Sequence, residues 1–478
     1  MSNNWTNIGS YIQEYTKGIT PKYVQQSNTI VLNQKCIRDN QIDYSFAQFV
    51  DDNQNVREDK YIRIGDILIN STGQGTAGRI AFVESLPNDK KVTIDSHILI
   101  LRCEDIITAN LIRYSLFSFE KTLMTFIDGS SGQGEFDKIR LFGTKIKLPT
   151  NNNILIVKLL SSIDKKIKLN NKIISELEQM AKELYDYWFV QFDFPDTNGK
   201  PYRSSGGKMV YNQTLKCEIP EGWKVDIIGD YAKVNSGFAF KSEWWKESGV
   251  PVIKILNITE NCKIDFNGCS FVDNDKIEVA RKFIAKPFDV VIAMTGATIG
   301  KYAIIPDNKL TILINQRVGL FDLGENPIDK LPYLINLLKQ SYVRETIISI
   351  ASGCAQPNIS GEDIENIIRI KPNDDYVNIF NSDTKDIYKK SLNLQRQNQE
   401  LATLRDWLLP MLMNGQVAVS GDSNHETNET SNAKVIEFIE NSDQRFELWL
   451  SNQGAAARGE IDKATLREIF DAMDEDDK

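Results

Sequence analysis

The sequence predicts a mixed α/β protein of the α+β type, with two similar domains, two long antiparallel coiled-coil helices and a small helical C-terminal appendage. The first observation is a repeat: GDILINSTGQGTAGRIAFV at 65–83 returns as FDVVIAMTGATIGKYAIIP at 288–306. Asp66 then corresponds to Asp289 and Pro149 to Pro372, both 223 residues further on, and a helical segment follows each proline. A period this long indicates two copies of a whole domain with its connector.

Both copies have the same local pattern. Residues 1–150 contain short β-branched runs (DILIN, RIAFV, HILIL) broken by Gly, Asn, Asp and Pro, and a helical stretch near 109–126. Residues 220–373 repeat it with PVIKILNI, DVVIAM and KYAII, followed by a helical stretch at 330–350. Short strands with interspersed turn residues and one helical stretch are typical of a mixed domain.

A heptad stripe follows each domain, within 151–194 and 374–417. The first stripe is Ile156, Leu160, Ile163, Ile167, Asn170, Ile174, Leu177, Ala181, Leu184 and Trp188. The second stripe is Asp383, Ile387, Lys390, Leu394, Gln397, Leu401, Leu404, Leu408 and Met411. Such stripes need a partner helix, and an antiparallel pair is simplest because a domain lies between them; Asn170, Lys390 and Gln397 would then fix the register. The alternative is that each helix packs on its own domain.

The remaining segments are connectors and a tail. Residues 195–219 and 418–434 are predicted linkers, and 435–478 is predicted to be an acidic helical tail. The tail lacks the glycine and the final glutamate of a calcium-binding loop. Our hypothesis is that it docks a partner subunit or shields basic faces from non-specific DNA.

Composition limits the class of protein. The N-terminus has no signal sequence and no apolar run reaches membrane-spanning length, which predicts a soluble, cytoplasmic protein without a membrane partner. The six cysteines include no C-x-x-C pair, so we expect reduced thiols and no metal site. The net charge is −9, but residues 420–478 hold 15 acids and 6 bases, so the rest of the chain is neutral. A neutral body can still gather its bases on one face.

The sequence offers little material for catalysis. Only His97 and His425 are histidines. The G-x-G-x-x-G at 73–78 precedes the strand-like RIAFV instead of opening a helix, which argues against a dinucleotide site. GATIGK falls one residue short of a phosphate-binding loop, and no D/N-P-P-Y/F methylase motif occurs. We therefore expect a chain that is not an enzyme and binds no cofactor.

Several blocks resemble the specificity subunit of type I restriction and modification systems. They are GDILINSTGQGTAGR, GATIGKY, SSGQGEFDKIRLFGTKIKLP, SGCAQPNISGEDIENIIRIKP and SLNLQRQNQELATLRDWLLPMLMNGQV, and the resemblance covers about 1–417. It implies two target-recognition domains at 1–150 and 220–373 and an antiparallel pair of spacer helices. It also implies a non-catalytic subunit that binds double-stranded DNA. The implied partners are two methyltransferase subunits, which use S-adenosylmethionine, and two restriction subunits, which use ATP and Mg²⁺.

A bipartite DNA target needs two readers and a spacer, and amide, hydroxyl and basic side chains on loops read base edges. The first-domain candidates are Ser71, Thr72, Gln74, Arg79, Ser96, His97, Ser130, Ser131 and Gln133. The second-domain candidates are Thr295, Thr298, Lys301, Asn315, Gln316, Arg317, Ser352, Gln356 and Asn358. For any single one of these residues, the alternative is that it lies in a solvated turn and contacts no base. Because 315–317 corresponds to 95–97 with different chemistry, we predict two unlike half-sites.

Phosphate contacts and alternatives complete the prediction. The expected phosphate contacts are Lys17, Lys22, Lys35, Arg38, Lys241 and Lys254. The aromatics Phe238, Phe240, Trp244 and Trp245 could stack on bases, but core packing is the commoner role. Two other functions stay open, a specificity subunit of a type IIB-like system and a coiled-coil scaffold that does not bind DNA.

Overall fold

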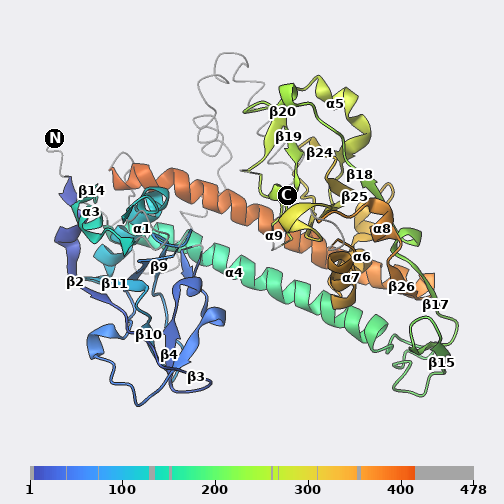
Figure 1. Ribbon diagram of the computed structural model, residues 1–478, viewed down its shortest axis with the longest axis horizontal. Coiled ribbons are helices and arrows are strands. Elements are labelled where there is room, and N and C mark those ends of the chain that lie inside the picture. The colour runs from blue at the N-terminus through green and yellow to red at the C-terminus, as the bar shows by residue number, and fades with distance from the viewer. Residues whose placement is uncertain are drawn as a thin grey trace, which may run out of the picture. The chain divides into compact units, whose positions relative to one another are not determined.

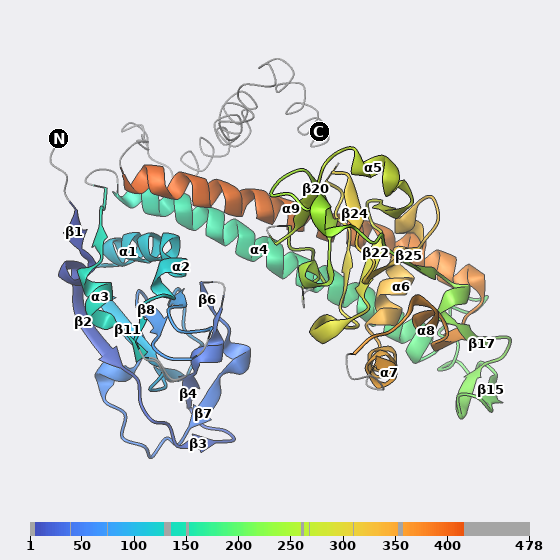
Figure 2. The ribbon, with the colours of Figure 1, turned by 45° about the horizontal axis from the view of Figure 1, so that its top comes forward.

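The chain folds into two compact units. In the computed structural model the first unit holds residues 1–165 and 402–478, and the second holds 166–401. The described residues are 5–38, 40–73, 75–128, 135–149, 153–259, 262–266, 268–308, 310–351 and 357–414. The predicted linker at 418–434 and the tail at 435–478 lie outside them. Figures 1 and 2 show the elements of each unit from two directions.

Two four-stranded sheets form the described centre of the first domain. One has the antiparallel order β2-β11-β8-β9, and the other has the order β10-β4-β7-β3 with β10 and β4 parallel. Their bounds are β2 Ile12–Lys17, β3 Tyr23–Val24, β4 Thr29–Leu32, β7 Gln48–Val50, β8 Ile67–Asn70, β9 Ile80–Phe82, β10 Lys91–Ile94 and β11 Ile98–Cys103. Successive side chains of a strand point to opposite faces. Ile67 and Ile69 of β8 therefore enter one apolar core and Leu68 enters another.

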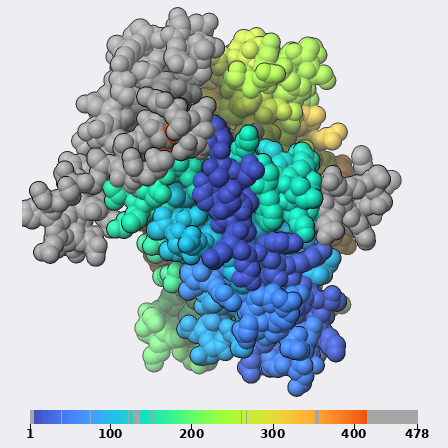
Figure 3. Space-filling view, turned by 90° about the vertical axis from the view of Figure 1, so that its left-hand side faces the viewer, coloured from blue at the N-terminus to red at the C-terminus, as the bar shows by residue number. Residues whose placement is uncertain are grey.

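Helices and short strand pairs complete the first domain. The strand pairs are β1 (Thr6–Asn7) with β14 (Lys145–Ile146), β5 (Ile37–Arg38) with β6 (Gln41–Ile42), and β12 (Ile127–Asp128) with β13 (Glu135–Phe136). The helical stretch expected over 109–126 is two helices, α1 (Ile106–Ser118) and α2 (Glu120–Leu123), because Phe119 leaves the helical conformation. A third helix, α3 (Lys138–Gly143), lies against the N-terminal residues, which are dark blue on the surface in Figure 3.

The second domain repeats both sheets. The order β18-β25-β22-β23 matches β2-β11-β8-β9, and in the sheet β20-β19-β24-β21 the strands β19 and β24 are parallel, as β4 and β10 are. Their bounds are β18 Lys233–Ser236, β19 Val250–Ile253, β20 Ser270–Val272, β21 Ile284–Ala285, β22 Val290–Ala293, β23 Tyr302–Ile304, β24 Ile312–Ile314 and β25 Val318–Asp322. The matching strand order confirms that the chain contains two similar α/β domains.

The other elements of the second unit modify two expectations. The stretch expected to be helical over 330–350 is two helices, α6 (Leu331–Leu338) and α7 (Ser341–Ala351). The segment 195–219, predicted to be a linker, contains most of a β hairpin made by β15 (Met209–Asn212) and β16 (Cys217–Pro220). The remaining elements are α5 (Lys276–Val279), α8 (Gly361–Glu365), and the pair β17 (Lys224–Ile227) with β26 (Ile368–Lys371).

The two long helices are α4 (Asn153–Tyr185) and α9 (Asp374–Met413). The stripe predicted for α4 is buried or half-buried along its length, and Asn170 is fully buried. In the first half of α9 the buried stripe is displaced by one residue from the prediction, because Thr384 and Tyr388 are buried whereas Asp383 is exposed.

Hydrogen bonding explains this displacement. The Thr384 hydroxyl donates to the Phe380 carbonyl at 2.6 Å, and the Tyr388 hydroxyl accepts from the Asn336 amide at 2.8 Å. Polar groups that are hydrogen-bonded can be buried at little cost, and a search for apolar residues alone overlooks them.

The prediction for Lys390 is wrong for the same reason, whereas Gln397 lies at the margin of the buried stripe. Lys390 is exposed and Gln397 only half-buried, whereas the adjacent Ser391 and Asn398 are buried. The amide of Asn170 donates to the amide oxygen of Asn398 at 2.9 Å.

None of the described helices is both long and apolar enough to cross a membrane.

Candidate nucleic-acid interface

Each domain presents two loops at one edge of its sheets. In the first domain they follow β8 (residues 71–79) and β10 (residues 95–97), and in the second they follow β22 (294–301) and β24 (315–317). We call them the β8–β9, β10–β11, β22–β23 and β24–β25 loops. The same backbone hydrogen bond joins the two loops of each domain: Ser71 N–H donates to the His97 carbonyl, and Met294 N–H donates to the Arg317 carbonyl.

The β10–β11 and β24–β25 loops have the same backbone and different side chains. The backbone N–H of Asp95 donates to the Leu32 carbonyl, and the backbone N–H of Asn315 donates to the Ile253 carbonyl. Leu32 and Ile253 are the last residues of the adjacent parallel strands β4 and β19. The side-chain oxygen of Asp95 or Asn315 then accepts from the amide two residues on, at 2.9 and 3.4 Å. This correspondence bears out the alignment of 95–97 with 315–317.

In the first domain Thr72 and His97 lie together. The Thr72 hydroxyl and the His97 Nδ1 are 2.6 Å apart, so Nε2 of this exposed histidine is left to meet a ligand. Asp95 is buried beneath them, and burial raises the pKa of its carboxyl. Ser96 and Arg79 are partly exposed at the same edge. This cluster presents an imidazole, a guanidinium and a hydroxyl.

In the second domain three exposed side chains surround the β22–β23 loop. Gln316 and Arg317 project from the β24–β25 loop, and Asn358 pairs with the backbone of Thr295 across a bridge. The hydroxyls of Thr295 and Thr298 are buried and have no hydrogen-bond partner among the described residues. This cluster presents two amides and a guanidinium.

Some predicted site residues lie beneath the loops. Ser71 is 1 % exposed and Asn315 is 8 % exposed, so both are placed to hold the loops and not to reach a ligand in this conformation. Lys301 is half-buried. The positions Gln74, Ser130, Ser131, Gln133, Ser352 and Gln356 lie outside the described residues.

Sequence reasoning missed Gln34, which supports the β8–β9 loop. Its carbonyl accepts from the Asn70 amide at 3.0 Å, and its side-chain oxygen lies 3.3 Å from the Thr76 hydroxyl. Gly73, at φ +103°, lies so close that a Cβ there would be 2.2 Å from the Gln34 side chain. The sequence signal that could have identified Gln34 is the polar turn directly after β4, because β4 ends at the same sheet edge as the loops. In the second domain Ile255 lies under Gly296 instead.

The expected phosphate contacts differ in availability. Lys22, Lys35, Arg38 and Lys241 are exposed, and of these Arg38 lies over the Phe46 ring at 4.5 Å and Lys241 over the Trp244 ring at 5.5 Å. Lys254 is already engaged, since its ammonium lies 3.5 Å from the centre of the Trp245 ring and donates to the Ser270 hydroxyl at 2.8 Å. Burial lowers the pKa of Lys254, which further disfavours a role as a free cation.

The aromatic residues at the start of the second domain pack on one another. The rings of Phe238 and Trp244 are stacked with centroids 6.1 Å apart, and Phe240 contacts Trp245 at 5.5 Å. With Val252 and Leu313 they form an apolar cluster on the sheet. The structure therefore gives them the core role that the sequence favoured over base stacking.

The two domains thus carry loop clusters with one backbone plan and unlike side chains, as expected of a protein built from two related domains. The family model for the type I restriction modification DNA specificity domain matches residues 14–179 and 220–373. The chain belongs to this family, and its two domains are specificity domains.

Known proteins agree with this assignment. The specificity subunit of the type I restriction enzyme MjaIX of Methanocaldococcus jannaschii is 25 % identical over 314 residues, which cover 64 % of this chain and 68 % of that protein. That of HindI of Haemophilus influenzae is 24 % identical over 420 residues, covering 75 % and 88 %. The S subunit structure from M. genitalium has a TM-score of 0.51 at 16 % identity, with 86 % of this chain and 97 % of that chain covered. The structural likeness shows the fold.

Proposed function

We propose that the first domain reads one half of a bipartite DNA target and the second domain reads the other half. The observation that carries this proposal is the shared backbone of the β10–β11 and β24–β25 loops, which present Ser96 and His97 in one domain and Gln316 and Arg317 in the other. Arginine pairs best with guanine and glutamine with adenine in the major groove. The two half-sites are therefore unlike, and the target is asymmetric.

We propose further that α4 and α9 form an antiparallel coiled coil that sets the unread spacer and docks the methyltransferase subunits. Residue numbers rise along α4 as they fall along α9 in three contacts: Asp164 to Arg405 in the first unit, and Asn170 to Asn398 and Glu178 to Ser391 in the second. Because the numbers change in opposite directions, these contacts support antiparallel pairing of the two helices. The buried pair Asn170 and Asn398 would fix the register of that pairing. α4 has 33 residues and α9 has 40, so at a rise of about 1.5 Å per residue they are about 50 and 60 Å long, which suits a spacer of about one and a half turns of B-DNA.

The chain acts in this proposal as the non-catalytic subunit of a larger complex. Two methyltransferase subunits would modify adenine with S-adenosylmethionine, and two restriction subunits would use ATP and Mg²⁺. The acidic tail would dock a partner or limit non-specific DNA binding. Deleting 420–478 tests both roles, and unchanged assembly with unchanged binding to random DNA would remove them.

The decisive experiment is methylation-sensitive long-read sequencing of DNA from cells that express this chain with its cognate methyltransferase subunit. We expect a bipartite motif with methylated adenines, unlike halves and an unread spacer. A palindromic motif would refute the asymmetry. No modification by a well-formed complex would favour the scaffold function, and co-purification with a fused nuclease would favour a type IIB-like system.

A further inference from the structure

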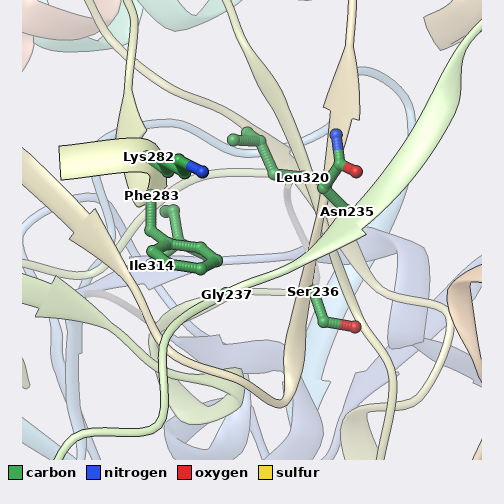
Figure 4. A pocket seen from close by; sticks show the side chains of 7 residues that line it. All are labelled: Asn235, Ser236, Gly237, Lys282, Phe283, Ile314 and Leu320. Atoms are coloured by element: carbon green, nitrogen blue, oxygen red, sulfur yellow. The ribbon is translucent and has the colours of Figure 1, made fainter. Parts of the chain in front are cut away.

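A pocket of about 360 Å³ opens in the second domain beside the β24–β25 loop. Figure 4 shows Lys282 and Phe283 on one side of it and Asn235 and Leu320 on the other. Ile314 and the backbone of Gly237 line its base. The pocket thus combines an ammonium group and an amide with an apolar floor.

Lys282 lies near the loop that we propose reads DNA. Ile284 of β21 pairs with Leu313 of β24 in an antiparallel arrangement. Lys282 and Phe283 precede Ile284 in a short 3-10 helix, Arg281–Phe283, and line the pocket together with Ile314, the residue before the loop. On the other side Gly237 lies against Asn315 so closely that a Cβ there would be 2.4 Å from the Asn315 carbonyl oxygen. The pocket therefore adjoins the start of the β24–β25 loop.

The polar groups of the pocket are available. Lys282 and Asn235 are exposed, and within the described part of the chain neither side chain has a hydrogen bond or ion pair. A lysine ammonium is a compact point charge with three donors, and amide N–H groups add further donors. The ligand that this chemistry favours is an anion with several oxygens. The apolar side chains of Phe283, Ile314 and Leu320, which also line the pocket, suit a sugar ring attached to such an anion.

The first domain serves as an internal comparison, because its own side chains occupy the corresponding place. Tyr61 bridges Thr93 as Ile284 pairs with Leu313, so Lys282 corresponds to Asp59. Asp59 accepts hydrogen bonds from Arg57 at 3.0 Å, and the Lys60 ammonium donates to the carbonyl of Gly18 at 3.1 Å. An acid therefore stands where the second domain has Lys282, and the neighbouring Lys60 is engaged with the backbone, so the first domain offers no matching cation for an anion. The cationic pocket is therefore a feature of the second domain.

We propose that this pocket binds a single phosphodiester of the DNA backbone, next to the bases that the β24–β25 loop reads. Lys282 and Asn235 donate to the phosphate oxygens, and the adjoining deoxyribose packs on Phe283. The contact holds the second domain in register on its half-site and confers no choice of base. Domain two is anchored at this position and domain one is not. This inference rests on the proposed DNA-reading function.

The test compares Lys282→Gln with Lys246→Gln in the full chain bound to its methyltransferase subunit. Both variants lose one positive charge from the same domain. Lys246 lies before the first strand residue of β19, whereas the loop adjoins Ile253 at the other end of that strand. Among the described residues its ammonium makes an exposed ion pair with Asp273 at 3.5 Å. The probe is a duplex carrying the motif found for the wild type, and its affinity is measured between 50 and 200 mM salt.

We expect Lys282→Gln to lower the slope of log affinity against log salt by about 0.9, the value for one phosphate. Over this fourfold range of salt the affinity ratio of wild type to variant then shrinks about 3.5-fold. The methylation motif stays unchanged. In addition, one methylphosphonate in the half-site of domain two should weaken the wild type and leave Lys282→Gln unaffected. Lys246→Gln should keep the wild-type slope.

Three outcomes would overturn the anchor. They are a wild-type slope for Lys282→Gln, the same loss for both variants, or an altered motif, which would make Lys282 a reader of bases. If the wild type itself yields no bipartite motif, the proposed function fails, and the anchor fails with it. If the wild type yields the motif and Lys282→Gln binds like it, only the anchor fails.

Discussion

Asp289→Asn should stabilise the second domain at neutral pH. Asp289 is 5 % exposed, and its carboxylate accepts from the backbone N–H of Lys286 at 2.7 Å. The Lys286 ammonium points elsewhere, to the Gly324 carbonyl at 3.1 Å. Burial raises the pKa of Asp289 from 3.8 to about 6, and the nearby Asp322 adds to the rise. Among the described residues no cation pairs with this buried carboxylate.

The expected magnitude follows from linkage. The unfolded chain releases this proton near pH 3.8 and the folded chain near pH 6. Between these values the folded state binds more protons, so stability falls as pH rises and stays lower above pH 6. At 1.36 kcal/mol per pKa unit the ionised carboxylate costs about 3 kcal/mol at pH 7 and about half of that at pH 5. Asparagine keeps the hydrogen-bond acceptor and removes the charge.

Asp66→Asn at the corresponding position of the first domain is the matched control. Asp66 is also buried, but Arg102 donates to it at 3.0 Å, and Arg102 is itself 7 % exposed. Removing the carboxylate leaves a buried guanidinium that retains only the half-exposed Glu14 as an acidic partner. Breaking a buried ion pair in this way costs about 3 kcal/mol or more. The same substitution should thus have opposite signs in the two domains.

Hydrogen exchange in urea, read on peptides that contain β8 and β22, measures the two domains separately. We expect protection of β22 to rise in Asp289→Asn by about 1 to 3 kcal/mol at pH 7 and by about half as much at pH 5. Protection of β8 should fall in Asp66→Asn. A loss of protection in Asp289→Asn at pH 7, or an equal gain at both pH values, would refute the reasoning.

Three further predictions concern the loops and the helices. Arg317→Ala should relax the motif at one base pair of one half-site and cost about 1–3 kcal/mol of binding; a uniform loss across sequences in a binding selection would contradict this. Gly237→Ala places a Cβ 2.3 Å from the Ile314 carbonyl oxygen. This clash should displace the β24–β25 loop, so methylation by the complex should be lost. Hydrogen exchange should show that β8, in the first domain, stays protected. Asn170→Leu removes the donor to the Asn398 amide oxygen, while the Asn398 amide still donates to Asn171, and should lower the free energy of unfolding by about 1–3 kcal/mol. Leu at both positions should restore it in urea titrations; a double variant no more stable than the single one would argue against a shared seam.

Much of the fold could be predicted because it depends on local pattern. The repeat at 65–83 and 288–306 identified two domains, and the β-branched runs located the central strands. The break at Phe119 could not be predicted, since the apolar pattern continues through it. The buried stripe of α9 was misplaced because Thr384 and Tyr388 are buried through hydrogen bonds made with residues close only in the folded chain.

The parts of the candidate site that lie in turns directly after strands could be predicted from the sequence. The parts whose position depends on packing in the folded domain could not. The loops at 95–97 and 315–317 could be aligned because similar β-branched runs flank both of them. Gln34 and Lys282 carry no motif, and only the folded arrangement of each domain brings them near the loops. Burial of Ser71 likewise depends on the surrounding sheet, and the sequence shows only a polar residue after a strand.

The two domains differ beneath their loops as well as in them. In the first domain Asp66 is buried in an ion pair with Arg102. In the second domain the corresponding Asp289 is buried without a cation partner among the described residues, and Asp322, which stands in place of Arg102, is exposed. A buried carboxylate must therefore be paired or have a raised pKa, because an uncompensated buried charge costs several kcal/mol. The exposed loop positions carry no such constraint, so His97 and Arg317 can occupy the same backbone site, and under the proposed function one fold then carries two different recognition chemistries.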